Sequence, residues 1–126
     1  LDLSNRLILD INYISEEKRE LYFKATDCLA LPYELIFQSG VLLMSLSYGL
    51  PVVATKIAPF EEVIEDGQNG LLFEKGNFKH LAQQLNILMN NKDLMTDMTQ
   101  NAINHMREDY SWDDIAKGYT SILNSL

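Results

Sequence analysis

The sequence predicts an α/β fold in which helices cover both faces of a parallel sheet. Short apolar segments alternate along the chain with segments in which apolar residues recur every three or four positions. The short segments are apolar throughout, as is typical of parallel strands that are buried on both faces. A chain of 126 residues has the length of about one domain, so we expect a single core.

Four of the short apolar segments are expected to be strands. They are rich in Leu, Ile and Val, and a turn or a predicted helix separates each from the next. They cover residues 6–14, 28–31, 52–54 and 71–73. The turn sequence DGQNG leads directly into the last of them.

A first helix is predicted immediately after residues 6–14. Ser15 is a suitable N-cap, and Glu16 and Glu17 follow it at the positive end of the helix dipole. The buried stripe of this helix is expected to consist of Leu21, Tyr22 and Ala25.

A second helix is predicted over residues 39–48, which are apolar on nearly every side and should therefore be buried. Gly49 suits the position just beyond its end, and Pro51 prevents its continuation. The last third of the chain predicts three more helices, each with an apolar stripe of helical period. They cover residues 78–89, 95–106 and 112–126.

The composition argues against several classes of function. Binding to nucleic acid or to an anionic membrane needs clustered Lys and Arg, whereas the formal net charge here is −8. No apolar run approaches the roughly 18–20 residues of a membrane span. The one cysteine, Cys28, cannot form an internal disulfide, which fits the cytoplasm, and we expect it to be a small buried hydrophobic residue.

Few residues suit acid–base or metal chemistry. His80 and His105 lie on predicted helices, and we expect them to be surface residues or to be hydrogen-bonded within the protein. No pair of His or Cys residues has the spacing of zinc ligands. The sequence therefore assigns no catalytic residue, no metal and no cofactor.

The best candidate site is the start of the second helix, just beyond the strand of residues 28–31. In open α/β sheets, ligands bind beyond the carboxyl ends of the strands, beside the N-termini of the following helices. The free N–H groups of such a helix attract an anion, and Gly40 has no side chain to keep a phosphate away from them. Ser39 would either cap the helix or donate its hydroxyl to a ligand.

A second candidate position is the loop after the strand of residues 52–54. Lys56 would either meet an anion there or remain solvated. Glu61 and Glu62 would either take part in acid–base chemistry or stabilise the start of a short helix.

Five motifs follow one another along the chain: ATDCLALPY, SGVL, GLPVVAT, EEVIEDGQNGLLF and YSWDDIAKGY. In this order they resemble the C-terminal, nucleotide-sugar-binding domain of retaining glycosyltransferases of the GT-B fold, the glycosyl transferases group 1 family. The resemblance implies a Rossmann-like parallel sheet between helices. It makes residues 1–126 part of a donor-binding domain, with residues 111–126 as a C-terminal helix.

The resemblance also implies a substrate and its contacts. The donor would be a UDP- or GDP-linked sugar, held by backbone amides at Gln38, Ser39, Gly40 and Val41. In this family an N-terminal domain binds the acceptor across a cleft, and a basic pair that neutralises the diphosphate precedes the matched segment. We expect both to be missing from this chain, so that the final helix exposes apolar surface or forms a dimer.

Several positions depart from the family. Ile36 and Met44 occupy the places of two glutamates of the usual donor site, and Glu34 lies near enough in sequence to substitute for the first. Glu62 matches a family acid, with a weaker expectation of ligand contact, as for Glu34 and Lys56. We interpret the sequence QSG at the donor loop as the mark of a variant branch.

Two functions are therefore open. The favoured one is the donor-binding part of a glycosyltransferase that moves a sugar from a nucleoside diphosphate to an acceptor, with this fragment alone inactive. The alternative is a non-catalytic binding or assembly module that keeps the fold, and the departures at Ile36 and Met44 motivate it. The full-length protein is expected in the cytoplasm or at the periphery of a membrane.

Overall fold

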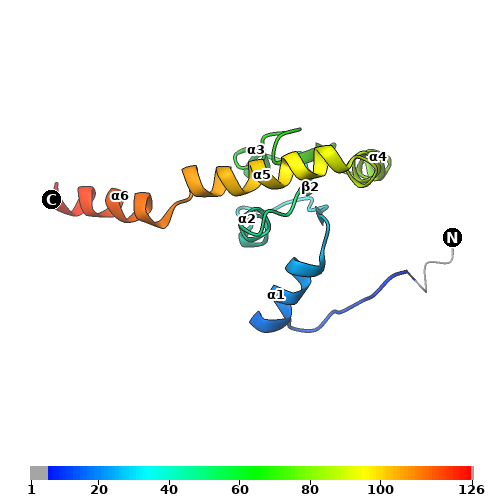
Figure 1. Cartoon of the computed structure of the whole chain (residues 1–126), viewed down its shortest axis with the longest axis horizontal. Coiled ribbons are helices and arrows are strands. Elements are labelled where there is room, and N and C mark those ends of the chain that lie inside the picture. The colour runs from blue at the N-terminus through cyan, green and yellow to red at the C-terminus, as the bar shows by residue number, and fades with distance from the viewer. Residues whose placement is uncertain (1–5, 126) are drawn as a thin grey trace.

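The computed structural model describes residues 6–125 and arranges three strands and six helices as an α/β domain (Figure 1). The order is α1 (Glu16–Ala25), β1 (Leu29–Leu31), α2 (Gly40–Ser47), β2 (Val52–Thr55), α3 (Ala58–Glu61), β3 (Gly70–Phe73), α4 (Phe78–Met89), α5 (Lys92–Asp109) and α6 (Trp112–Asn124). Residues 1–5 and 126 of the predicted domain and final helix lie outside the described residues.

The sheet is parallel, as predicted, with the strand order β1-β2-β3. Helix α2 connects β1 to β2, and α3 lies between β2 and β3. Side chains satisfy part of the free edge of β3, because the Leu72 amide donates to Asp66 Oδ1 at 2.8 Å and Gln84 Nε2 donates to the Leu72 carbonyl at 3.0 Å.

Alternate residues of the strands enter two separate apolar clusters. Val52 and Ala54 of β2 pack in the cluster that contains residues of α2 and α3. Val53, between them, packs in the cluster that contains residues of α4. Helix α5 contributes Ala102 to the first cluster and Met98 to the second. Helices therefore cover both faces of the sheet, which confirms the predicted sandwich.

The ends of α2 follow their predicted chemistry. Ser39 is the N-cap, and its Oγ accepts from the Leu42 amide at 3.1 Å. Gly49 follows the helix with a φ of 71°, a left-handed conformation that favours glycine. The buried residues Leu42 and Leu46 then fix the helix against the sheet.

The predicted strand at residues 6–14 is wrong, since these residues form no strand and no ladder with β1. Ile8 and Ile11 are almost fully exposed, and this segment extends away from the sheet (Figure 1). Leu and Ile content predicts an extended chain, but a strand also needs a neighbouring strand to bond its N–H and C=O groups.

The predicted buried stripe of α1 is also wrong. Leu21, Tyr22 and Ala25 are exposed, and α1 has no buried residue. Its Ser15 cap is present, as predicted, with Oγ accepting from Lys18 N. The helix touches the body of the domain through Phe23, whose ring stacks on Tyr48 with centroids 5.3 Å apart. Because residues 6–14 do not extend the sheet, α1 has little surface to cover.

Helix α6 leads away from the body of the domain beyond the end of α5 (Figure 1). Its apolar stripe is bare: Trp112 is 83% exposed, and Tyr119 and Ile122 are exposed as well. This agrees with the expectation that the final helix presents apolar surface. Among residues 6–125, no helix combines the length and apolar character that crossing a bilayer requires.

Candidate functional site

A cavity of about 390 Å³ lies beside the N-terminus of α2. The loop that precedes α2, α2 itself, the α3 region and the end of α5 supply its walls. The lining residues are Gln38, Ser39, Gly40, Leu42, Leu43, Pro59, Glu62, Val63 and Tyr110. The loop and α3 follow β1 and β2, so the cavity lies where an open α/β sheet binds ligands.

Ser39 fulfils the capping role and keeps its donor free. Its Oγ accepts from the Leu42 amide, and its carbonyl accepts from Leu43 N at 3.3 Å. A hydroxyl that accepts through its oxygen retains its own O–H for donation. The two interpretations of Ser39, as cap and as ligand donor, are therefore compatible in this geometry.

Gly40 is not required by the fold. A Cβ at Gly40 would meet no atom within 4 Å, and the residue does not have a positive φ. Gly49 and Gly70, by contrast, have close neighbours at the same distance limit. Gly40 is the first residue of α2, and the amides of this first turn have no acceptor within the helix. This is the geometry that suits an anion.

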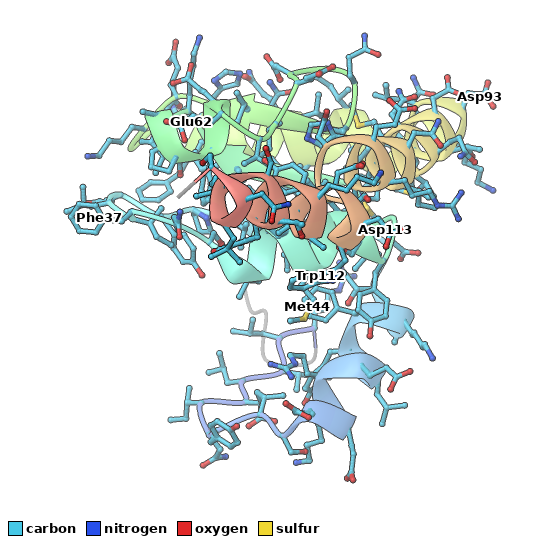
Figure 2. The ribbon with its side chains drawn as sticks, turned by 90° about the vertical axis from the view of Figure 1, so that its left-hand side faces the viewer. Phe37, Met44, Glu62, Asp93, Trp112 and Asp113 are labelled. Atoms are coloured by element: carbon cyan, nitrogen blue, oxygen red, sulfur yellow. The ribbon has the colours of Figure 1, made fainter. Side chains whose placement is uncertain are left out.

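The structure brings together only some of the predicted site residues. Gln38, Ser39, Gly40 and Glu62 line the same cavity, although they come from two separate segments. Glu62 projects from the α3 region on the side of the molecule where Phe37 points outward into solvent (Figure 2).

The other three predicted residues do not line the cavity. Val41 belongs to the first turn of α2, one residue beyond Gly40. Lys56 is exposed, with Nζ 3.9 Å from Glu61 Oε1. Glu34 is exposed on the loop after β1. Ligand contact by these three residues remains a prediction, and none of them lines the cavity.

Ile36 and Met44, where the resemblance leads us to expect glutamates, have separate surroundings. Ile36 is half-buried and packs against the apolar cluster under α2. Met44 lines a second, mainly apolar cavity of about 460 Å³ together with Trp112. Both side chains are labelled in Figure 2, which views the molecule from the side of α6. A glutamate carboxylate accepts hydrogen bonds from sugar or ribose hydroxyls, whereas the isoleucine side chain has no acceptor and the methionine thioether is only a weak one.

Five of the lining residues were not predicted from the sequence: Leu42, Leu43, Pro59, Val63 and Tyr110. Leu42 and Leu43 follow directly after Gly40 in α2. Pro59 and Val63 lie within three residues of Glu62, so the prediction of Glu62 as a site residue could have indicated them as well. Tyr110 had no such signal, because it is brought to the cavity by the packing of α5 on α2.

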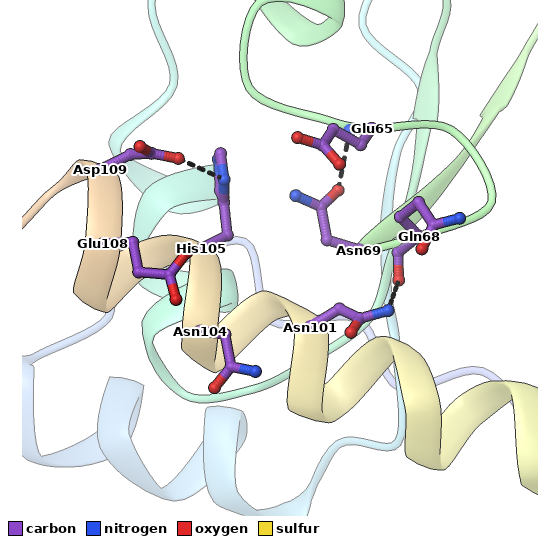
Figure 3. A pocket seen from close by; sticks show the side chains of 8 residues that line it. All are labelled: Glu65, Gln68, Asn69, Asn101, Asn104, His105, Glu108 and Asp109. Atoms are coloured by element: carbon purple, nitrogen blue, oxygen red, sulfur yellow. Dashed lines mark hydrogen bonds and ion pairs between the residues drawn. The ribbon is translucent and has the colours of Figure 1, made fainter.

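A third cavity, of about 290 Å³, is polar and lies between α5 and the turn before β3 (Figure 3). Three carboxylates line it, those of Glu65, Glu108 and Asp109. Asp109 Oδ2 lies 2.9 Å from His105 Nδ1. Since carboxylates repel a phosphate, the cavity beside α2 is the better site for an anionic ligand.

The remaining candidates for catalysis have structural roles. His80 Nδ1 accepts from the Glu74 amide at 3.1 Å, as expected of an internally hydrogen-bonded histidine. Cys28 is half-buried, and burial raises the pKa of its thiol, which disfavours the thiolate nucleophile. Within residues 6–125, no three His, Cys, Asp or Glu side chains converge on a metal position.

Comparison with known proteins identifies the family. The sequence profile of "Glycosyl transferases group 1" matches residues 3–105. An uncharacterized glycosyltransferase of Haemophilus influenzae is 28% identical over 103 residues, which are 81% of this chain and 29% of that protein. The D-inositol 3-phosphate glycosyltransferase of Corynebacterium urealyticum is 30% identical over 104 residues, 82% of this chain and 24% of that protein.

The solved structures agree in fold. The Anabaena protein HepE in complex with UDP superposes with a TM-score of 0.81 at 24% identity, over 89% of this chain and 31% of HepE. Its complex with UDP-glucose gives a TM-score of 0.75 at 25% identity, over 82% of this chain and 29% of HepE. The chain thus spans about a third or less of the length of these proteins. Because the profile covers most of it, the chain belongs to the glycosyl transferases group 1 family and has the fold of a GT-B C-terminal domain.

Proposed function

We propose that this chain is the donor-binding part of a longer glycosyltransferase that moves a hexose from a nucleoside diphosphate to an acceptor. The observation that carries the proposal is the open helix start at Gly40, where the fold itself requires no glycine. The family match and the Anabaena complexes with UDP and UDP-glucose support a UDP-sugar, with a GDP-sugar as the alternative.

The proposed role of the α2 N-terminus is to hold the diphosphate. The amides of Gly40 and Val41 belong to the first helical turn, so they can donate to phosphate oxygens. Negative charge builds on the diphosphate as its bond to the sugar breaks, and donors that are already in place stabilise that charge. The free O–H of Ser39 and the amide of Gln38 add further donors at the same wall.

Glu62 is better suited to the sugar than to the phosphates. Its carboxylate lines the cavity and would repel a diphosphate, but it accepts hydrogen bonds from sugar hydroxyls. No Lys or Arg lines this cavity among residues 6–125. We therefore propose that basic residues outside this segment balance the diphosphate and that an N-terminal domain binds the acceptor. This chain alone would bind donor without transferring sugar.

Several further properties of the whole protein stay proposals. We place it in the cytoplasm or at the periphery of a membrane. We propose that the bare stripe of α6 is covered in the whole protein or pairs with a second copy. The sequence QSG at Gln38, Ser39 and Gly40 would mark a donor site that works without the two usual glutamates.

The test compares two glycines that both have open space around them. Gly40→Val places a side chain over the α2 amides, while Gly118→Val adds the same group on α6, away from the cavity. Calorimetric titration of this chain with UDP, GDP and UDP-glucose should show binding of one nucleotide class. Gly40→Val should weaken it by about tenfold or more, since charge-assisted hydrogen bonds contribute about 1.5–3 kcal/mol each, and Gly118→Val should not. Absence of nucleotide binding by the unmodified chain and by the full-length protein would sink the proposal.

A non-catalytic module is the second candidate, favoured by one observation. Met44, where the resemblance leads us to expect a glutamate, lines an apolar cavity rather than the donor cavity. Sugar release from UDP-glucose or GDP-mannose by the full-length protein, measured by chromatography, separates the two functions. Donor binding without turnover, together with a stable complex with a separate transferase, would favour the module.

A further inference from the structure

Tyr110 connects the donor cavity with the end of the domain. It caps the C-terminus of α5 and precedes Ser111, the N-cap of α6. Although it is distant in sequence from the loop before α2, it lines the same cavity as Ser39 and Gly40. It also lines the apolar cavity of Met44, as Gly40 and Leu43 do, so the two cavities share these three residues.

A residue of α5, His105, packs against the ring of Tyr110. The His105 ring packs against it edgewise, with centroids 5.5 Å apart and an interplanar angle of 63°. His105 is itself fixed, because its Nδ1 lies 2.9 Å from Asp109 Oδ2 (Figure 3), and its side chain is only 15% exposed. A half-buried aromatic ring with a fixed neighbour presents a defined surface to a ligand.

The donor cavity has a polar part and an apolar part. Gln38, Ser39, Gly40 and Glu62 form the polar part, whereas Tyr110 belongs with the apolar side chains of the lining. A diphosphate can use the helix amides and hydroxyl of the polar part. The apolar part offers nothing to a phosphate, but an aromatic face suits a flat or ring-shaped group.

We infer that Tyr110 contacts the ring group attached to the diphosphate, either the nucleobase or the sugar, and thereby selects the donor. This inference rests on the proposed function, because it places the diphosphate at Gly40. The shared chemistry is stacking of a ring on an aromatic face. Truncation of such a ring weakens binding by about tenfold, while the diphosphate contacts remain.

The experiment measures dissociation constants of the full 126-residue chain for UDP, UDP-glucose and inorganic pyrophosphate. The variants are Tyr110→Ala and Tyr110→Phe. Tyr119→Ala is the matched control, since Tyr119 is a 69% exposed tyrosine of α6 that lines neither cavity. Circular dichroism and the Tm of each variant show whether the fold is retained.

Tyr110→Ala should weaken a ring-bearing ligand about tenfold and leave pyrophosphate unchanged, and Tyr110→Phe should bind as the unmodified chain does. An equal loss of affinity for UDP and UDP-glucose indicates that Tyr110 contacts the base. A loss of affinity for UDP-glucose alone indicates that it contacts the sugar. An equal loss of affinity for pyrophosphate, or no loss for any ligand, overturns the inference.

The same measurements separate this inference from the proposed function. If the unmodified chain binds nucleotide and Tyr110→Ala binds it equally well, only this inference is wrong. If neither this chain nor the full-length protein binds nucleotide, the proposed function falls with it.

Discussion

Gly70 pairs in register with Val52 across the β2–β3 ladder, so closely that a Cβ on Gly70 would lie 2.8 Å from the Val52 carbonyl oxygen. The same Cβ would lie 3.1 Å from Ile64 Cγ2. The glycine is therefore a packing requirement of the sheet, because backbone atoms cannot give way as the end of a flexible side chain can.

We expect Gly70→Ala to lower the free energy of unfolding by about 1–3 kcal/mol, as overpacking of a core does. Urea unfolding followed by circular dichroism measures the change. Gly118→Ala is the control, because its Cβ meets open space on α6 and should be neutral or stabilising. A Gly70→Ala variant that unfolds at the same urea concentration as the unmodified chain contradicts the close approach.

Gly49 and Gly67 separate backbone strain from packing. Both have a positive φ, of 71° and 82°, but only Gly49 has a close neighbour, with its Cβ position 2.9 Å from Ile103 Cδ1. Alanine should cost about 1–2 kcal/mol of unfolding free energy at either site through strain. Gly49→Ala should cost about 1 kcal/mol more through the contact. In an Ile103→Ala background most of this excess should vanish in a double-mutant cycle, and its full persistence would show that the Ile103 contact is not its cause.

The sequence predicts structural features correctly where they depend only on neighbouring residues. The Ser39 cap and the Gly49 terminus of α2 are confirmed because each depends on residues within one turn. The buried strand at Val52–Thr55 is confirmed because its apolar run needs only covering helices. The strand predicted at residues 6–14 is wrong because pairing depends on a distant partner that composition does not specify.

The candidate site was readable to the same extent. Gln38, Ser39 and Gly40 share one loop, so a helix start identified all three. Glu62 joins them because β1 and β2 are neighbours in the sheet, as expected for one βαβ unit. Tyr110 was not predictable, because its position results from the packing of α5 against α2 and no local pattern encodes that contact.

Asn69 holds the turn before β3 with its side chain. It is 1% exposed, its Oδ1 accepts from the Glu65 amide at 2.9 Å, and its Nδ2 donates to the Val63 carbonyl at 3.2 Å. Asn69→Ala leaves both backbone groups without these partners and should cost about 2 kcal/mol of unfolding free energy. Asn101→Ala is the control, since its amide donates to Gln68 at an exposed position, and it should change stability by less than about 0.5 kcal/mol. Equal effects in thermal unfolding would contradict the role of Asn69.

Cys28 should react slowly with thiol reagents in the folded chain. Burial, and to a smaller extent the charge of Asp27, raises the pKa of its thiol, so less thiolate is present at any given pH. The alkylation rate by iodoacetamide should therefore rise with pH at a higher midpoint than in urea, where the thiol titrates near its usual value of about 8.5. Mass spectrometry of timed samples gives both curves. A folded-state midpoint at or below the urea value would show that Cys28 is open to solvent.

Trp112 reports whether the apolar stripe of α6 is bare in solution. It is the one tryptophan of the chain, and it is 83% exposed, with Ile115 beside it in the lining of the apolar cavity. An exposed indole has the same surroundings before and after unfolding, so its emission maximum should shift little in urea when the protein is dilute. A shift to shorter wavelength as protein concentration rises, matched by a larger mass in sedimentation, would show that a second copy covers the stripe. Ile122→Glu, on the same stripe, should abolish that shift if the stripe forms the contact, because a carboxylate would be buried without a partner.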